Sequence, residues 1–281
     1  MDNRKRFAVQ AVSSLLQNAH IKGFFTGKIY QGPLKQVCVP GINCYSCPGA
    51  VGACPIGSLQ SFLNGRRFRF PYYVLGLLLF FGALLGRAVC GFLCPFGWVQ
   101  ELLNKLPVPK KNRFRADRPL RLLKYLVLLL LVIALPLGMK LVPAFCKYLC
   151  PAGTSAGLLL ALGDPALPGL WGGLFKWKLA VLIAVVLACL FIWRPFCKYL
   201  CPLGAFYGLF NRFALVRMDL DADKCIGCRA CAAACRMCVD PSRTPNSTEC
   251  IRCGDCVRAC PTQALHLGVR HTVPQTTKNE P

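Results

Sequence analysis

Two runs of four cysteines near the C-terminus have a spacing that binds iron. Each run has the period C-x2-C-x2-C-x3-C, and the second is followed by Pro261. Three closely spaced thiolates on a tight loop can hold three irons of a cubane, while the fourth cysteine starts a helix that leads away. The pattern predicts two [4Fe–4S] clusters. The eight thiols are Cys225, Cys228, Cys231, Cys235, Cys250, Cys253, Cys256 and Cys260.

At this spacing the fourth cysteine of each run ligates the cluster of the other run, as in bacterial two-cluster ferredoxins. Gly227 and Gly254 let the backbone turn tightly and bring amide N–H groups near the sulfurs, where hydrogen bonds tune the reduction potential. Cluster one is expected to bind Cys225, Cys228, Cys231 and Cys260. Cluster two is expected to bind Cys250, Cys253, Cys256 and Cys235.

A zinc site is the alternative interpretation, because C-x2-C pairs also bind zinc. Zinc takes four ligands and seldom uses a run of four at this period, so iron is favoured. The first run also departs from the usual pattern. Arg236 stands where Pro commonly follows the fourth cysteine, and Cys238 is an extra thiol. We interpret Cys238 as a packed or free thiol, with replacement of Cys235 as ligand as the alternative.

A second motif, C-x3-C-P-x-G, occurs three times before these runs, and a partial copy occurs at Cys54. Three identical spacings, each closed by Pro, favour metal ligands over buried apolar filler, the interpretation kept for the lone Cys189. Pro suits the first turn of a helix, whose N-terminus would face the thiolates. Ten thiols suffice for two further four-ligand clusters with two left over, and the sequence leaves the pairing open. They are Cys38, Cys44, Cys47, Cys54, Cys90, Cys94, Cys146, Cys150, Cys197 and Cys201.

Each full copy of the motif follows an apolar stretch: Tyr72–Val89, Leu120–Val142 or Leu179–Trp193. A membrane span needs roughly 17–25 apolar residues. The second stretch meets that length, and the other two meet it marginally. Three such stretches flanked by basic and aromatic residues favour a lipid bilayer over the core of a soluble protein.

The charge distribution agrees with a membrane protein. The net charge is +23. Residues 1–218 hold 26 Lys and Arg against four acids, which is net +22, and residues 219–265 hold six of each. Because the bases flank the apolar stretches, at Arg66–Arg69 and Lys110–Arg121, we expect these loops in the cytoplasm and no nucleic-acid partner.

Four cations lie directly beside the cysteine pairs, and a charge inside a membrane needs a partner. An anionic iron–sulfur cluster is the expected partner. For Lys147 and Lys198, the headgroup level of the bilayer is the alternative. The four are Arg87, Lys147, Arg194 and Lys198.

The predicted fold is an α-helical membrane protein, with three long spans and short return or interfacial helices, plus a small α+β bacterial two-cluster ferredoxin-like domain. Residues 1–70 form an N-terminal amphipathic and cysteine-rich segment, since Phe7–Leu16 is short and lacks a small-residue cleavage site. Residues 71–213 form the membrane domain, 214–268 the ferredoxin-like domain and 269–281 a tail. Each repeat is expected to be a hairpin turning at C-x3-C-P, with three single crossings as the competing topology.

The C-x3-C-P pairs beside apolar spans, with a C-terminal two-cluster domain, resemble the NapH/NosR-type membrane polyferredoxins over about residues 30–268. The resemblance implies electron transfer between a membrane or external donor and cytoplasmic clusters, with quinol in the NapH branch and an external FMN domain in the NosR branch. The chain differs from NosR in having no room for that flavin domain. It differs from NapH in its third full cysteine pair and in the N-terminal cysteines.

The predicted function is a relay of electrons between the ferredoxin-like module and a partner such as a flavoprotein, a ferredoxin or a quinone-linked subunit. We expect it in the cytoplasmic (inner) membrane, with the module in the cytoplasm, as an electron-carrier subunit rather than a stand-alone enzyme. No residue set indicates a catalytic site, and none of the three His lies in an apolar stretch. A metal-reducing assembly factor of the RdxA/CcoG type, tied to copper handling, is the main alternative, and a structural anchor is another.

Overall fold

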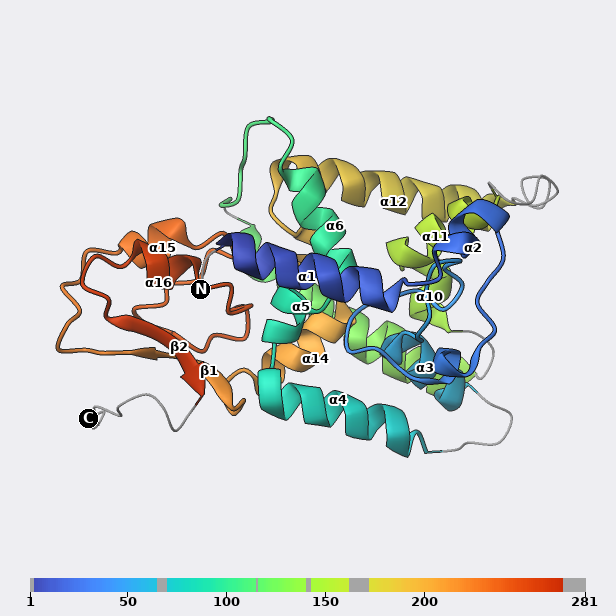
Figure 1. Cartoon of the computed structure of the whole chain (residues 1–281), viewed down its shortest axis with the longest axis horizontal. Helices are drawn as coiled ribbons and strands as arrows, with labels where there is room; N and C mark the ends of the chain where they lie inside the picture. The colour runs from blue at the N-terminus through green and yellow to red at the C-terminus, as the bar shows by residue number, and fades with distance from the viewer. Residues whose placement is uncertain (1–2, 65–69, 115, 140–142, 162–171, 270–281) are drawn as a thin grey trace.

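The computed structural model of the chain describes residues 3–64, 70–114, 116–139, 143–161 and 172–269. Helices form most of it, and a small module with the two strands lies at one end (Figure 1). The expected tail, residues 269–281, lies outside the described residues except for Val269, and so does the basic stretch Arg66–Arg69.

The N-terminal segment begins with an inside-out helix. Helix α1 (Asn3–Gln17) buries polar side chains against the rest of the chain and exposes apolar ones. The buried polar residues are Arg6, Gln10, Ser14 and Gln17; the exposed apolar ones are Val9, Val12, Leu15 and Leu16. Helices α2 (Ile21–Thr26), η1 (Pro33–Gln36) and α3 (Pro55–Leu63) follow, with the N-terminal cysteines in the loop between η1 and α3.

The C-x3-C-P-x-G motif builds the same three-part unit three times. An apolar helix leads into a five-residue helix that carries the first cysteine, and a further helix begins at the Pro after the second cysteine. The first unit is α4 (Tyr72–Leu85), α5 (Ala88–Phe92) and α6 (Pro95–Asn104). The second follows the short α7 (Asp117–Leu120) and is α8 (Leu123–Val127), η2 (Leu128–Ala134) and α9 (Leu135–Met139), then α10 (Ala144–Tyr148) and α11 (Pro151–Ala161). The third is α12 (Gly173–Phe191), α13 (Pro195–Tyr199) and α14 (Pro202–Phe210).

Two of the three expected spans reach the length that a bilayer requires. Among the described residues, Asp117–Gly138, with 22 residues, and Gly173–Phe191, with 19, are long and apolar enough to cross a membrane. Only 22% and 11% of their apolar windows are buried in the chain, unlike the core helix of a soluble protein. The remaining expected span, Tyr72–Val89, is not confirmed as a long one, because α4 has 14 residues, about 21 Å at 1.5 Å per residue. It ends where Gly86 adopts a φ of +50°.

The C-terminal module consists of one antiparallel strand pair and two short helices. Strand β1 (Val216–Leu220) pairs with β2 (Leu265–Val269), and α15 (Ala230–Ala234) and α16 (Asp255–Ala259) follow the two cysteine loops. Gly227 and Gly254 have φ values of +70° and +81°, as the tight turns require. At the matching loop positions Arg252 and Arg229 also adopt positive φ, of +56° and +58°.

Buried hydrogen bonds dock this module on the three-part units. Arg252 is fully buried, and its guanidinium donates to the carbonyls of Leu85 at 2.6 Å and Asn211 at 2.7 Å. The Asn211 amide donates to the carbonyl of Cys250 at 2.7 Å. These bonds offset the strain of a positive φ at a non-glycine residue. The second cysteine loop is therefore fixed against α4 and α14.

A substitution at Gly91 in α5 tests how closely the module packs against the membrane half. A Cβ atom at Gly91 would lie 2.7 Å from the carbonyl oxygen of Ile251, inside the second cysteine loop. We expect Gly91→Ala to push the two backbones apart and destabilise the protein by roughly 1–3 kcal/mol, the usual range for overpacking. The measurement is thermal unfolding in detergent, followed by circular dichroism.

Gly76→Ala is the matched control, because Gly76 also lies in a helix and nothing lies within 4 Å of the point that a Cβ atom would occupy there. Removing a helical glycine there should stabilise the protein by about 0.5–1 kcal/mol. Equal unfolding temperatures for the Gly91 variant and the wild type would contradict the close docking.

Candidate metal centres

The ten membrane-half cysteines separate into two groups of four and two remaining thiols. Four thiols, from the N-terminal loop and the second unit, line one cavity of about 730 Å³. They are Cys44, Cys54, Cys146 and Cys150, which we call cage four. The thiols of Cys44, Cys54 and Cys150 lie within electrostatic range of Cys146.

The first and third units form a second group, cage three. Its four thiols lie within electrostatic range of one another, and all are at most 4% exposed. They are Cys90, Cys94, Cys197 and Cys201. Cage three is enclosed by protein, whereas cage four adjoins an open cavity.

Helix N-termini face the thiols of both groups. The amide of Gly204 donates to Cys201 Sγ at 3.1 Å, two residues after the Pro that starts α14. The amides of Gly57 and Gly153 donate to the thiols of Cys54 and Cys150 in the same way. Backbone N–H groups at a helix N-terminus stabilise negative charge, as ligand thiolates require.

Two glutamines that the sequence did not point to link the cysteine-bearing helices within each cage by hydrogen bonds. Gln100 donates through Nε2 to Cys197 Sγ at 3.1 Å and accepts through Oε1 from the amide of Phe196 at 3.1 Å. Gln60 makes the same pair of bonds, to Cys146 Sγ at 3.4 Å and from the amide of Phe145 at 3.0 Å. Each glutamine stands six residues after the cysteine of a C-P-x-G sequence, at Cys54 or Cys94.

The module brings cysteines of its two runs together. The thiols of Cys235, Cys250, Cys253 and Cys256 line one apolar cavity, which we call cage two. Cys231 of the first run lies within electrostatic range of Cys260 of the second. Both contacts join the two runs, and the crossed ligation of the two clusters stays a prediction. We call Cys225, Cys228, Cys231 and Cys260 cage one.

Four thiols of the chain lie outside the cages. Cys238 Sγ donates to the carbonyl of Asn112 at 3.1 Å and does not line cage two. Cys38 donates to Ser58 Oγ at 3.4 Å, and Cys47 lies 3.9 Å from Asn18 Oδ1. Cys189 is fully buried in α12 near Gln100.

Three of the four cations beside the cysteine pairs have carboxylate partners from distant parts of the chain. Arg87 contacts Glu249 at 2.8 Å, Arg194 contacts Glu101 at 3.2 Å and Lys198 contacts Asp117 at 2.5 Å. All three cations are fully buried. The alternative that Lys198 would reach the headgroups is therefore wrong, and the expected cluster partner stays a prediction beside these carboxylates. Lys147 has its ammonium over the Tyr148 ring, 5.4 Å from the centroid.

Glu249 joins the module to the membrane half. Its carboxylate accepts from Arg87 and from the buried ammonium of Lys124. Burial alone would raise the pKa of the Glu249 carboxyl, but the two adjacent cations outweigh it and hold the pKa below its usual range. Glu249 is therefore charged at neutral pH and neutralises part of the positive charge beside cage three.

The thiol arrangement fits a cubane better than a single metal ion. Within the described part of the chain, no three His, Cys, Asp or Glu side chains come close enough to hold one ion. A cubane binds each of its four thiolates through a different iron, so its ligands stand further apart than those of zinc. Four thiols around one cavity, with amide donors aimed at several of them, provide such a cage.

Comparison with known proteins supports this interpretation. A 4Fe-4S binding domain family matches residues 52–73, 70–113, 123–175 and 177–220, together more than half of the chain. A second 4Fe-4S binding domain family matches residues 218–237 and 244–266. These matches define the chain as an iron–sulfur protein that binds [4Fe–4S] clusters.

Relatives that match more than two thirds of the chain identify the family. An uncharacterized protein of Methanocaldococcus jannaschii is 29% identical, over 75% of this chain and 76% of the relative. The methylamine utilization ferredoxin-type protein MauN of Methylorubrum extorquens is 30% identical, over 76% and 71%. The ferredoxin-type protein NapH of Haemophilus influenzae is 26% identical, over 69% and 66%. No solved structure matches significantly. The chain belongs to the NapH/NosR-type polyferredoxins, which are ferredoxin-type electron-transfer proteins.

Removing a thiol of cage three should remove one cluster and leave the others. We expect Cys197→Ala to lower the iron content by about four atoms per chain, because a [4Fe–4S] cluster needs four thiolates. Cys189→Ala, a neighbouring buried thiol outside the cages, is the control and should keep all iron. Iron and sulfide assays on anaerobically purified protein make the comparison. Loss of iron in the Cys189 variant alone would reverse the assignment.

The glutamine amides should tune the clusters that they contact. A hydrogen bond to a ligand sulfur stabilises the reduced, more negative state, so Gln100→Leu should lower one reduction potential. A net bond energy of about 0.5–1.5 kcal/mol corresponds to roughly 20–60 mV for one electron. Potentiometric titration with electron paramagnetic resonance measures this shift. Gln60→Leu should shift a different signal; a shift of the same signal by both variants would contradict two separate cages.

Proposed function

We propose that the chain is a membrane-bound relay with four [4Fe–4S] clusters, held by cages one to four in that spatial order. Cages one and two share the module, since their cysteines come from the same two runs. The observation that carries the proposal is the contact between the module and cage three. Gly91, between Cys90 and Cys94, lies against the carbonyl of Ile251, the residue after Cys250.

Contacts between cages three and four continue this order. A Cβ atom at Gly41, in the loop that carries Cys44, would lie 2.9 Å from Cys94 Cα. The fully buried Tyr207 donates through its hydroxyl to the carbonyl of Pro40 at 3.0 Å. It lies within electrostatic range of Cys54 in cage four and of cage-three thiols. Protein groups therefore fill the space between the two cages.

The chain's own residues prepare each cage for a redox group. When bound, a [4Fe–4S] cluster supplies one-electron transfer. The amides of Gly57, Gly153 and Gly204 stabilise the ligand thiolates, and the buried side chains around cage three exclude water. Arg87 and Arg194 offset negative charge there, donating to the carbonyls of Cys197 at 2.9 Å and Cys90 at 2.5 Å.

The membrane location rests on exposed apolar helices. Asp117–Gly138 and α12 have the length to cross a bilayer and are mostly exposed, and α1 turns its apolar residues outward. Water disfavours such surfaces, whereas lipid solvates them. The proposed location is the cytoplasmic membrane, with residues 71–213 embedded and 214–268 forming the cytoplasmic module.

The orientation rests on contacts of two basic residues that flank α7. Arg113 donates to the carbonyl of Ala232 at 2.5 Å, and Arg121 donates to the carbonyl of Met237 at 3.0 Å. The loop and the module therefore lie on one face.

The ends of α4 and α12 lie at this face too, since Arg252 of the module donates to the carbonyl of Leu85 and Lys110 donates to that of Leu190. Because Asp117–Gly138 begins there, the apolar helices alternate in direction, which supports the competing topology of single crossings over the hairpins. Basic loops remain on the cytoplasmic side. Cage four, beside its open cavity, is then the end that a quinone-linked or flavin-bearing partner would reach.

Electron transfer into sealed liposomes tests the relay. Protein is reconstituted with its module outside, an impermeant oxidant is enclosed, and a reductant is added outside. We expect the wild type and Cys189→Ala to reduce the enclosed oxidant, and Cys197→Ala to fall to the rate of protein-free liposomes. Retained module signals in electron paramagnetic resonance would show that the variant folds.

Two outcomes would contradict the relay. Undiminished transfer in Cys197→Ala would mean that cage three lies off the path. Absence of transfer in the wild type, with one copper ion bound per chain, would favour a metal-reducing assembly factor instead.

A further inference from the structure

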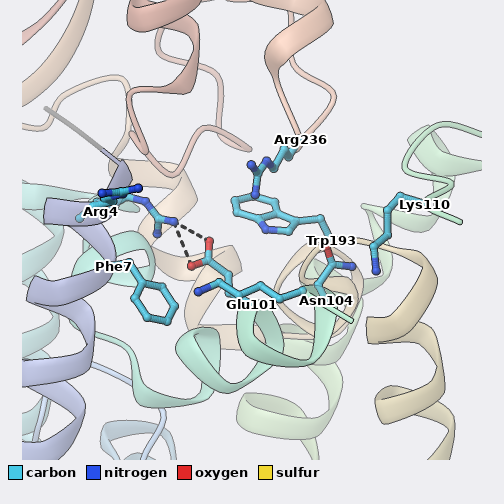
Figure 2. Close-up of a pocket in the computed structure, with 9 residues that line it drawn as sticks. Arg4, Phe7, Glu101, Asn104, Lys110, Trp193 and Arg236 are labelled. Carbon is cyan, nitrogen blue, oxygen red and sulfur yellow. Dashed lines mark hydrogen bonds and ion pairs between the residues drawn. The ribbon is translucent and has the colours of Figure 1, made fainter. Parts of the chain in front are cut away.

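A basic pocket, lined by no cage cysteine, lies where the membrane half meets the module. The cavity has a volume of about 480 Å³ and lies between the start of α1, the end of α6, the residues after α12 and the module. Figure 2 shows Arg4 and Phe7 on one side, Lys110 on the opposite side and the Arg236 guanidinium above the Trp193 ring. The lining residues are Arg4, Arg6, Phe7, Glu101, Asn104, Lys105, Lys110, Trp193 and Arg236.

The pocket holds five cations and one carboxylate. That carboxylate, Glu101, is already engaged, because it accepts two bonds of 2.9 Å from Arg6 and lies 3.2 Å from Arg194. Among the five cations, Arg236 forms an ion pair with Asp255 of the module, 3.6 Å away. Arg4, Lys105 and Lys110 have no carboxylate partner within the described residues. The pocket therefore has an excess of positive charge.

Helix α1 adds to this excess. Arg4, Lys5 and Arg6 occupy its first turn, which contains no acid. The N-terminus of a helix carries partial positive charge, so cations there are unfavourable unless an anion is bound. Lys105 extends over the Phe7 ring, 3.5 Å from the centroid, and Lys110 donates to the carbonyls of Leu106 and Leu190 at 2.8 Å each. Several donors thus surround one cavity whose only carboxylate among the described residues, Glu101, is already engaged by Arg6 and Arg194.

We propose that this pocket binds the phosphate of an anionic phospholipid. Phosphate is the anion that basic clusters and helix N-termini recognise most readily. Trp193 and Lys110 stand at the end of α12, the level at which Trp and basic residues meet headgroups. Further along α1, an apolar groove of about 660 Å³, lined in part by Val9, Val12 and Leu16, offers a surface for acyl chains.

Bound phosphate would join the membrane half to the module. Arg236 follows Cys235 of cage two directly, and its guanidinium lies over the Trp193 ring, 5.8 Å from the centroid. An anion between Arg4, Lys110 and Arg236 would neutralise charges from both parts. This inference rests on the proposed membrane location.

The amount of anionic lipid that the purified protein retains tests the proposed site. Full-length protein is purified from nanodiscs of phosphatidylcholine with or without phosphatidylglycerol, and bound lipid is identified by native mass spectrometry. We expect one retained phosphatidylglycerol per chain. The double variant Arg4→Ala/Lys110→Ala should bind it about thirtyfold more weakly, from about one kcal/mol per cation near the surface. The control Lys22→Ala/Lys28→Ala removes two exposed cations near the other end of α1 and should bind as the wild type does.

The remaining outcomes separate the lipid site from the membrane location. Equal retention of both lipids, or an unchanged double variant, would overturn the site while the protein stays in the membrane fraction. Binding of inorganic phosphate in detergent, lost in the double variant, with no lipid preference, would assign the pocket to a soluble phosphate and also overturn it. Protein that remains soluble without lipid would instead refute the membrane location on which the inference rests.

Discussion

The Glu249 carboxylate, held between Arg87 and Lys124, fixes the relation between the module and the membrane half. All three groups are buried, and loss of one member of such a set strongly destabilises a protein because it leaves uncompensated charge. Arg87 also donates to the carbonyls of Thr248 at 2.7 Å and Cys197 at 2.9 Å. One side chain thus contacts the approach to cage two and the backbone of cage three. The contact between the two cages depends on it.

The other described acids of the membrane half also form ion pairs with buried cations. Glu101 pairs with Arg6 and Arg194, and Asp117 pairs with Lys198. The half remains strongly basic after these pairs are formed. Positive charge near a cage favours the addition of an electron, whereas carboxylates oppose it. The acids therefore neutralise only the cations that would otherwise be buried alone, and the remaining charge stays available to the clusters.

Most of what could be predicted from the sequence came from the spacing of residues that lie close together in the chain. The cysteine periods indicated [4Fe–4S] clusters, and Pro after each second cysteine indicated the helices that begin there. The span expected over Tyr72–Val89 was not confirmed, because an apolar run does not reveal that Gly86 takes a positive φ and ends α4. The carboxylate partners were missed because they lie far away in the chain, Glu249 by 162 residues from Arg87. The pairing of the cysteine copies is equally non-local, and spacing alone could not decide it.

A signal for that pairing was nevertheless present in the side chains. Copies at Cys54 and Cys94 continue as C-P-x-G-x-x-Q, and the later two read F-C-K-Y-L-C-P. Each glutamine binds the Phe-Cys step of a later copy, Gln60 across 86 residues and Gln100 across 97. The units are therefore interleaved, the first with the third and the second with the N-terminal partial copy. Cage four has its four thiols once the chain has passed Cys150, whereas cage three has them only after Cys201. Because cage three joins the first unit to the third, nearly the whole membrane half must be folded before that cage is complete.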